Sequence, residues 1–239
     1  MNPGRDRCLH EMGLGPLWKL RTMQVPLEAA QEPSIAEEPV TIPPPVAATA
    51  AQVTDWDSLA AAVRDCRKCR LCSARKQAVL GVGDVNADWL FVGEGPGAEE
   101  DQRGEPFVGQ AGKLLDNMLA AIGLRRGSDV YIANAVKCRP PENRTPETEE
   151  MEACRPYLEC QIALIRPKLI VALGRPAAQT LLKTEVKIAA ARGRLHEYLG
   201  IPLIVTYHPA YLLRNLPDKS KAWEDLCFMR REMAKLKGS

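Results

Sequence analysis

Short runs of consecutive apolar residues alternate with helix-like segments along most of the chain after residue 55. Four of these runs have the length and composition of buried strands. They cover Trp89–Val92, Val130–Ile132, Leu169–Leu173 and Leu203–Val205. Because strands that are apolar on both faces need cover on both faces, this pattern predicts a parallel sheet between two layers of helices. The expected fold class is α/β, a three-layer α/β/α sandwich around a central, mostly parallel four-stranded sheet.

Apolar residues at helical spacing fill the segments between these strands. The expected helices cover residues 56 to about 69, 112–122 and 219–237. Thr145 and Pro146 have the character of an N-cap and a first-turn proline, so a further helix is expected to start there. Pro156 should kink or divide that helix, because proline has no N–H to donate.

The chain before residue 56 differs in composition from the rest. Residues 31–54 are rich in proline, alanine and acidic residues and show no amphipathic period. Ahead of them, residues 12–21 are short, apolar and basic, which suits either a docking peptide or a helix that packs on the core. We therefore expect an N-terminal extension and flexible linker over residues 1–55, with an unknown partner if it has one, and a catalytic domain over residues 56–239.

Composition sets only broad limits on function. The 239 residues are 46% hydrophobic and 26% charged, with a formal net charge of +2. Residues 1–55 hold four Lys/Arg against seven Asp/Glu, which leaves 28 against 23 for the remainder, so the basic excess lies in the expected domain. A mild excess of this kind permits nucleic-acid binding without indicating it. With no apolar run of about 18 residues and a charged N-terminus, the chain is expected to be cytoplasmic, without membrane contact, and monomeric.

The eight cysteines are unevenly spaced, and in an intracellular chain this favours metal ligation over disulfides. Cys66 and Cys69 form a CxxC pair, and Cys138 and Cys154 flank the RPPENRTP segment. Four such thiolates suit either a four-iron four-sulfur cluster or an all-cysteine zinc site. Cys72 is a spare candidate beside the first pair. The others, Cys8, Cys160 and Cys227, are interpreted as bystanders.

A glycine-rich segment, GEGPG at residues 93–97, follows the first strand. A phosphate-binding loop is one interpretation, but a Walker loop ending at Gly112 and Lys113 would have Phe107 where its first glycine belongs. The looser dinucleotide fingerprint also matches poorly, since the expected acid falls at Asp116 inside a helical pattern. Glu94 is unusual in such a loop and is a candidate for positioning water or stabilising a cation.

Two other polar residues directly follow predicted strands. Asn134 comes after the second strand and His208 after the last, so parallel topology brings both to the edge of the sheet that carries Glu94. Phe107 lies in a glycine-flanked loop, where an aromatic ring either fills the core or stacks on a base. The remaining candidate, His196, is interpreted as structural.

Several motifs occur together in one order: GEGPGAEED, EPFVGQAGKLLD, YIANAVKCRPPENRTP, IVALG and HPAYLLR. This combination, over roughly residues 58–235, closely resembles family 4 uracil-DNA glycosylases. The resemblance implies the uracil-DNA glycosylase fold, excision of uracil from DNA in base excision repair, and nucleoid association through DNA in a bacterial-type cytoplasm. It also implies one [4Fe-4S] cluster on Cys66, Cys69, Cys138 and Cys154.

The resemblance lends roles to matching positions. Glu94, Gly95, Pro96 and Gly97 would line the uracil pocket, Phe107 would stack on the base, Asn134 would read its edge, and His208 would face the leaving group. Asn143 matches a polar position that supports the Glu94 loop. In HPAYLLR, either Leu212 or Leu213 would wedge into the DNA stack, with Arg214 holding phosphate. A related family that links covalently to DNA has a basic insertion after the asparagine strand, and this chain lacks it, so normal turnover is expected.

Two other classes of function fit parts of the sequence. A non-catalytic iron-sulfur or zinc nucleic-acid-binding module needs only the cysteines and the basic domain, and it would leave Glu94, Asn134 and His208 without a role. A nucleotide-dependent transferase would use GEGPG as its phosphate loop.

Overall fold

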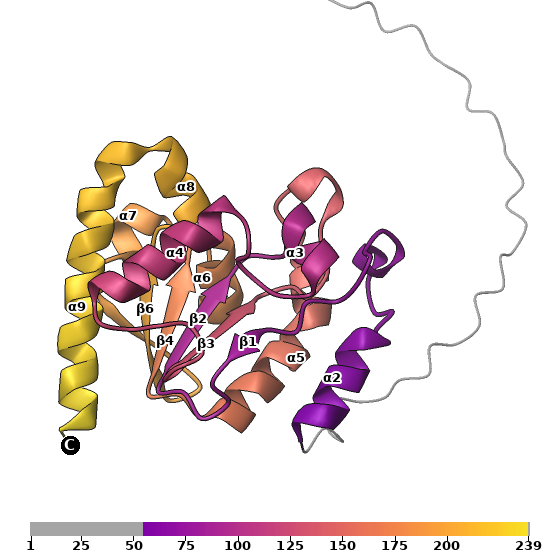
Figure 1. Cartoon of the computed structure of the whole chain (residues 1–239), viewed down its shortest axis with the longest axis horizontal. Helices are drawn as coiled ribbons and strands as arrows, with labels where there is room; N and C mark the ends of the chain where they lie inside the picture. The colour runs from indigo at the N-terminus through magenta and orange to yellow at the C-terminus, as the bar shows by residue number, and fades with distance from the viewer. Residues whose placement is uncertain (1–54, 239) are drawn as a thin grey trace, which may run out of the picture. The chain divides into compact units, whose positions relative to one another are not determined.

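The computed structural model describes residues 55–238 (Figure 1). The expected extension and linker at residues 1–55 therefore lie outside the described residues, apart from Asp55, which caps the first helix. No helix within residues 55–238 combines the length and the apolar character needed to cross a membrane.

The described residues contain a six-stranded sheet in the order β1-β3-β2-β4-β6-β5. Its strands are β1 (Val82–Gly83), β2 (Trp89–Gly93), β3 (Val130–Asn134), β4 (Leu169–Leu173), β5 (Leu195–Tyr198) and β6 (Ile201–Thr206). Strands β2, β3, β4 and β6 pair in parallel, whereas β1 and β5 pair antiparallel at the two edges. The four predicted parallel strands are confirmed, but the expected strand number was wrong by the two edge strands. One of these has only two residues and the other is mostly polar and exposed, so neither shows a buried apolar run.

Helices cover both faces of the sheet, as the three-layer prediction required (Figure 1). They are α2 (Trp56–Arg64), α3 (Ala98–Arg103), α4 (Gln110–Ala121), α5 (Thr148–Ile165), α6 (Arg175–Leu182), α7 (Ile188–Ala191), α8 (Pro209–Arg214) and α9 (Lys219–Lys237). Short 3₁₀ turns add η2 (Arg70–Ser73), η3 (Pro141–Asn143) and η4 (Leu216–Asp218).

Two apolar clusters join these layers. Side chains of α4, α8 and α9 pack with Phe91, Ile132 and Val171 on one face of the sheet. Side chains of α5 and α6 pack with Leu90 and Ile170 on the other face. Because neighbouring residues of β2 and β4 face opposite layers, every residue of these strands is buried.

A third cluster carries the cysteines and lies beside the sandwich. In it α2 packs against the start of η2 and the middle of α5, through Leu59, Val63, Leu71 and Tyr157. Helix α2 ends at Arg64, earlier than expected, and the following residues turn so that the first cysteine pair faces α5.

Helix α5 departs from the sequence prediction in two ways. It begins at Thr148 with Glu147 as N-cap, rather than at Thr145 and Pro146. It is also not divided at Pro156, and runs on to Ile165. The buried contacts of Leu158 and its neighbours with the sheet offset the hydrogen bond that proline removes.

Candidate active site

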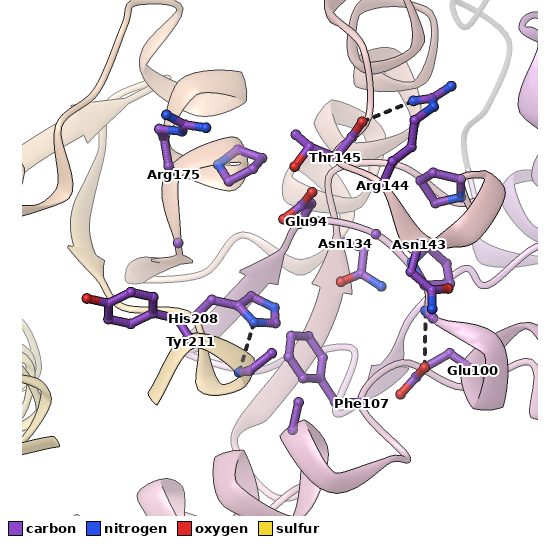
Figure 2. A pocket seen from close by; sticks show the side chains of 18 of the residues that line it. Glu94, Glu100, Phe107, Asn134, Asn143, Arg144, Thr145, Arg175, His208 and Tyr211 are labelled. Atoms are coloured by element: carbon purple, nitrogen blue, oxygen red, sulfur yellow. Dashed lines mark hydrogen bonds between the residues drawn. The ribbon is translucent and has the colours of Figure 1, made fainter. Parts of the chain in front are cut away.

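The carboxyl ends of the parallel strands open into one cleft of about 780 Å³ (Figure 2). Glu94 enters it after β2, Asn134 at the end of β3, Gly174 after β4, and His208 after β6. The predicted convergence of these segments at one sheet edge is confirmed. The cleft is also lined by Gly95, Pro96, Gly97, Phe107, Asn143 and Arg214, all of which the sequence had singled out.

Asn134 carries an unsatisfied hydrogen-bonding group into this cleft. Its side chain is only 2% exposed, and its Oδ1 atom has no hydrogen-bond partner among residues 55–238. A buried polar atom without a partner is costly, so its retention points to a ligand that supplies a donor. The neighbouring residue must be glycine, because a Cβ on Gly93 would lie 2.5 Å from that oxygen and 2.6 Å from the Phe107 ring.

Phe107 lies beside His208 in the wall of the cleft. Its ring centroid lies 5.5 Å from that of His208, and the two rings are tilted by 30° (Figure 2). Its backbone has a φ of +55°, a left-handed conformation that a phenylalanine rarely adopts. The surrounding loop must therefore be held in place by other contacts.

Glu100, which the sequence analysis did not single out, supplies some of these contacts. Its carboxylate accepts hydrogen bonds from the main-chain N–H groups of Gly97, Val108 and Gly109, at 3.1, 3.0 and 3.1 Å. It thus joins the GEGPG segment to the Phe107 loop. Of these three amides only that of Gly97 belongs to GEGPG, and Glu100 already occupies it, which weakens the transferase interpretation.

Glu94 lies half-buried in the cleft, and burial raises the pKa of its carboxyl group. A hydrogen bond from Thr145 and the charge of Arg175 act in the opposite direction and favour the carboxylate. Thr145 and Arg175 both line the cleft, but the sequence analysis did not identify either one as a residue of the site.

The main chain forms a hydrogen bond with one of the two ring nitrogens of His208. Its Nδ1 accepts a hydrogen bond of 3.1 Å from the main-chain N–H of Ala210, so a neutral ring carries its proton on Nε2. Burial lowers the pKa of His208 to about 4, with a smaller contribution from Arg214. The ring is thus neutral at pH 7 and has one N–H to donate. The other predicted histidine, His196, contacts the carbonyl of Ala191 and lies apart from the cleft lining.

Asn143 lines the cleft and its Oδ1 accepts from Arg139 at 2.7 Å, while Thr145 donates a hydrogen bond to Glu94, so a role of Asn143 in supporting the Glu94 loop stays a prediction. One expectation needs correction. Leu212 was a candidate for contacting DNA, but it is 1% exposed because it faces the core beneath α8. Its neighbour Leu213 is 42% exposed and is the leucine available at the surface.

The four predicted cysteine ligands come together. Cys66, Cys69, Cys138 and Cys154 line one small cavity with Cys72, and all are free thiols. Cys160 and Cys227 are absent from its lining, and Cys8 lies outside the described residues.

Hydrogen-bond donors surround these sulfur atoms. Arg75 donates to Cys138 Sγ at 2.8 Å, and the main-chain N–H of Lys137 donates to Cys154 Sγ at 3.2 Å. Burial raises the pKa values of Cys69 and Cys138, and that of Cys154 to about 12, so a bound cation is needed to hold these groups as thiolates. No group of three His, Cys, Asp or Glu residues in the described part of the chain has the spacing of a single-ion site.

A buried carboxylate connects the cysteine loop with the cleft. Glu150 is 2% exposed and accepts two hydrogen bonds from Arg144, at 2.8 and 2.7 Å, and one from Arg70 at 3.2 Å. Arg70 also pairs with Glu147. The hydrogen bonds from Arg144 lower the pKa of Glu150, so this carboxylate is charged and fully paired.

Residues 80–227 match the family model described as the uracil DNA glycosylase superfamily, and the chain belongs to this superfamily. The match spans the cleft residues from Glu94 to Arg214 and includes Cys138 and Cys154, whereas Cys66 and Cys69 precede it.

Curated relatives define the type more closely. The chain is 43% identical over 180 residues to a "Type-4 uracil-DNA glycosylase" of Pyrobaculum aerophilum, covering 72% of this chain and 91% of the relative. It is 48% identical over 155 residues to the protein of that name from Thermotoga maritima, covering 64% and 80%. A "Type-5 uracil-DNA glycosylase" of Pyrobaculum aerophilum is 35% identical over 149 residues, covering 56% and 66%.

Proposed function

We propose that this protein is a type-4 uracil-DNA glycosylase, which hydrolyses the N-glycosidic bond of deoxyuridine in DNA and leaves an abasic site. The observation that carries the proposal is the buried, unpaired Oδ1 of Asn134 in a cleft whose other walls are Phe107 and His208. The membership of the superfamily and the type-4 relatives support it.

Base recognition follows from the Asn134 amide. Its Oδ1 accepts from the N3–H group of uracil, and its Nδ2 donates to the O4 carbonyl. Cytosine has an acceptor and a donor at these two positions, so it would leave both groups of a buried amide opposed to like groups. The Phe107 ring stacks on the face of the base.

The base must leave the duplex before it can enter the cleft, at a cost of a few kcal/mol. Leu213 is exposed on α8, in the same helix that His208 caps, and fills the vacated stack. Arg214, Arg144 and Arg175 line the cleft and place positive charge where the sugar-phosphate backbone enters.

Bond cleavage leaves its electron pair on uracil and a positive charge on the sugar. The neutral His208 ring donates its Nε2–H to the O2 atom of uracil as negative charge develops there. The Glu94 carboxylate stabilises the sugar cation and orients the water molecule, which adds to C1′ and releases a proton. The products are free uracil and an abasic site.

We further propose that one [4Fe-4S] cluster is held by Cys66, Cys69, Cys138 and Cys154. The shared cavity of the four thiols and the N–H donors to their sulfur atoms fit such a cluster, which is held by four cysteine thiolates. When bound, the cluster would hold the four cysteine sulfur atoms as thiolates in fixed positions. The chain's own Arg70, Glu150 and Arg144 then carry that rigidity to the loop that lines the cleft.

The proposed substrate is uracil-containing DNA, on which the protein acts as a monomer where the chromosome lies, in the cytoplasm of a bacterial-type cell. Residues 56–239 are proposed to form the glycosylase domain, with residues 1–55 as an appended segment.

The direct test is a uracil-containing oligonucleotide incubated with the protein in EDTA and without nucleotide. Free uracil and alkali-labile sites are expected from it, and neither from matched thymine or cytosine oligonucleotides. If protein with a full complement of iron binds the oligonucleotide without releasing uracil, the non-catalytic binding module is the better description.

A further inference from the structure

Phe107 has a backbone conformation that its own side chain does not favour. Its φ of +55° lies in the left-handed region, which is strained for a non-glycine residue and persists only where neighbouring groups hold it. The contacts of Glu100 are with the amides that follow Phe107, so they leave its own carbonyl group unaccounted for.

Arg126 holds that carbonyl. Its Nη1 donates to the carbonyl oxygen of Pro106 at 2.8 Å, and its Nη2 donates to that of Phe107 at 2.8 Å. The two ends of one planar guanidinium thus bind two consecutive carbonyls. These carbonyls belong to the peptide units on either side of the Phe107 Cα, so holding both restricts φ and ψ of Phe107.

Asp116 on α4 holds the guanidinium from the other side. Its Oδ1 accepts from Arg126 Nε at 3.0 Å. The side chain of Arg126 is 22% exposed and that of Asp116 is 48% exposed, so the pair lies at the edge of the domain rather than inside it. Among residues 55–238, every hydrogen bond of the Arg126 side chain goes to Asp116, Pro106 or Phe107.

Helix α4 also restricts the Phe107 carbonyl group. A Cβ atom on Gly112 would lie 1.7 Å from that oxygen, so the first turn of α4 packs directly on it. Arg126 and Gly112 therefore confine the same carbonyl from two sides.

We propose that Arg126, braced by Asp116, is a positioning residue that holds the Phe107 ring in place before the base arrives. This inference rests on the proposed function, because it assumes that the ring stacks on uracil. Arg126 is not among the described residues that line the cleft, so it acts through Phe107. Lysine cannot replace it, since an ammonium group does not bind two carbonyls in one plane.

The test is a double-mutant cycle on uracil excision. Arg126→Ala is expected to raise the half-saturating concentration of uracil-DNA about tenfold, and to leave the maximal single-turnover rate within about threefold, because stacking acts on bound base and transition state alike. In a Phe107→Ala background the same substitution should change neither value by more than about twofold. Equal effects of Arg126→Ala in both backgrounds would overturn the proposal.

Arg125→Ala is the matched control, since it removes an exposed arginine one residue away. Arg125→Ala should leave the half-saturating concentration of uracil-DNA unchanged at the same ionic strength. An increase equal to that caused by Arg126→Ala would show instead that both arginines act by general electrostatic attraction to DNA. Arg126→Lys keeps the charge and should behave as Arg126→Ala does. Full activity of Arg126→Lys would contradict the forked contact.

A second measurement does not depend on activity. Hydrogen exchange of the Val108 and Gly109 amides should become at least about fivefold faster in Arg126→Ala and remain unchanged in Arg125→Ala. Unchanged exchange in Arg126→Ala would overturn the inference even if uracil excision is confirmed. A wild-type protein that releases no uracil would refute the proposed function, while the exchange result would still decide whether Arg126 fixes the loop.

Discussion

The main-chain N–H of Ala210 donates to Nδ1 of His208, and this contact fixes the neutral imidazole as an Nε2–H donor toward the cleft. The pKa of about 4 keeps the ring neutral through the physiological range. A neutral ring donates a hydrogen bond without first having to be protonated, so its contribution does not depend on an acid form that is scarce at pH 7.

Uracil excision is therefore expected to show no loss between about pH 5 and 8 and to fall at lower pH, as His208 is protonated. The free energy of unfolding should fall in the same direction. The unfolded ring, with a pKa near 6.5, takes up protons first, so stability is lost as the pH drops from about 6.5 toward 4. Single-turnover rates from pH 4.5 to 8 test this. An activity that rises as the pH is lowered from 8 to 6 would mean that the imidazolium is the active form.

Replacing His208 by Ala, or Glu94 by Gln, should each slow single-turnover excision by at least about a hundredfold while DNA affinity changes little. Gln keeps the size of Glu94 and still accepts the hydrogen bond from Thr145, so it removes mainly the charge. Gly95 follows Glu94, so Glu94 is the one carboxylate within GEGPG. Near-normal excision by Glu94→Gln would leave His208 and the DNA phosphates to carry the reaction.

Purified protein should be brown and contain iron and acid-labile sulfide. Substitution of Cys66, Cys69, Cys138 or Cys154 by Ser should remove the cluster absorbance and reduce soluble protein. Cys72→Ser is the matched control, since Cys72 lines the same cavity and should be dispensable. Stoichiometric zinc without sulfide would contradict the cluster, and loss of iron in Cys72→Ser would show that the ligand set is wrong.

The two adjacent leucines of α8 should differ in what their removal does. Leu212→Ala is expected to lower the free energy of unfolding by about 2–5 kcal/mol, because Leu212 is buried in the core. Leu213→Ala should leave stability within about 0.5 kcal/mol and slow excision from duplex DNA more than from single strands, where no stack must be filled. Thermal unfolding and excision assays on both substrates separate the two effects. Equal loss on the two substrates would argue against a wedge.

Removal of residues 1–54 should leave excision from naked DNA close to that of the full chain, because the residues proposed to bind and cleave the substrate and the four proposed cysteine ligands all lie within residues 55–238. Retention of the [4Fe-4S] absorbance is the control for folding. A truncated protein that keeps its cluster but releases no uracil would place part of the active site in the extension.

The sequence predicted the parallel strands well because strands buried on both faces have unbroken apolar runs, as in Leu169–Leu173. It missed the edge strand Leu195–Tyr198, whose residues are mostly exposed and polar. Glu94, Asn134 and His208 could be predicted because strand order alone brings them together.

The residues that hold this site could not be predicted in the same way. Glu100, Thr145 and Arg126 act through hydrogen bonds to main-chain or side-chain groups that no sequence period marks. Leu212 and Leu213 are chemically identical neighbours, so only the rotation of α8 decides which one faces solvent.

The Glu100 carboxylate has a further consequence for a cell crowded with nucleotides. Three amides that are arranged as an anion cradle are already occupied by an anion that the chain itself supplies. Because Glu100 is part of the same chain, it competes for these amides without having to bind from solution. A free phosphate group therefore cannot use these three amides unless Glu100 moves, and Arg144, Arg175 and Arg214 are the cationic side chains of the described cleft lining that it could still contact.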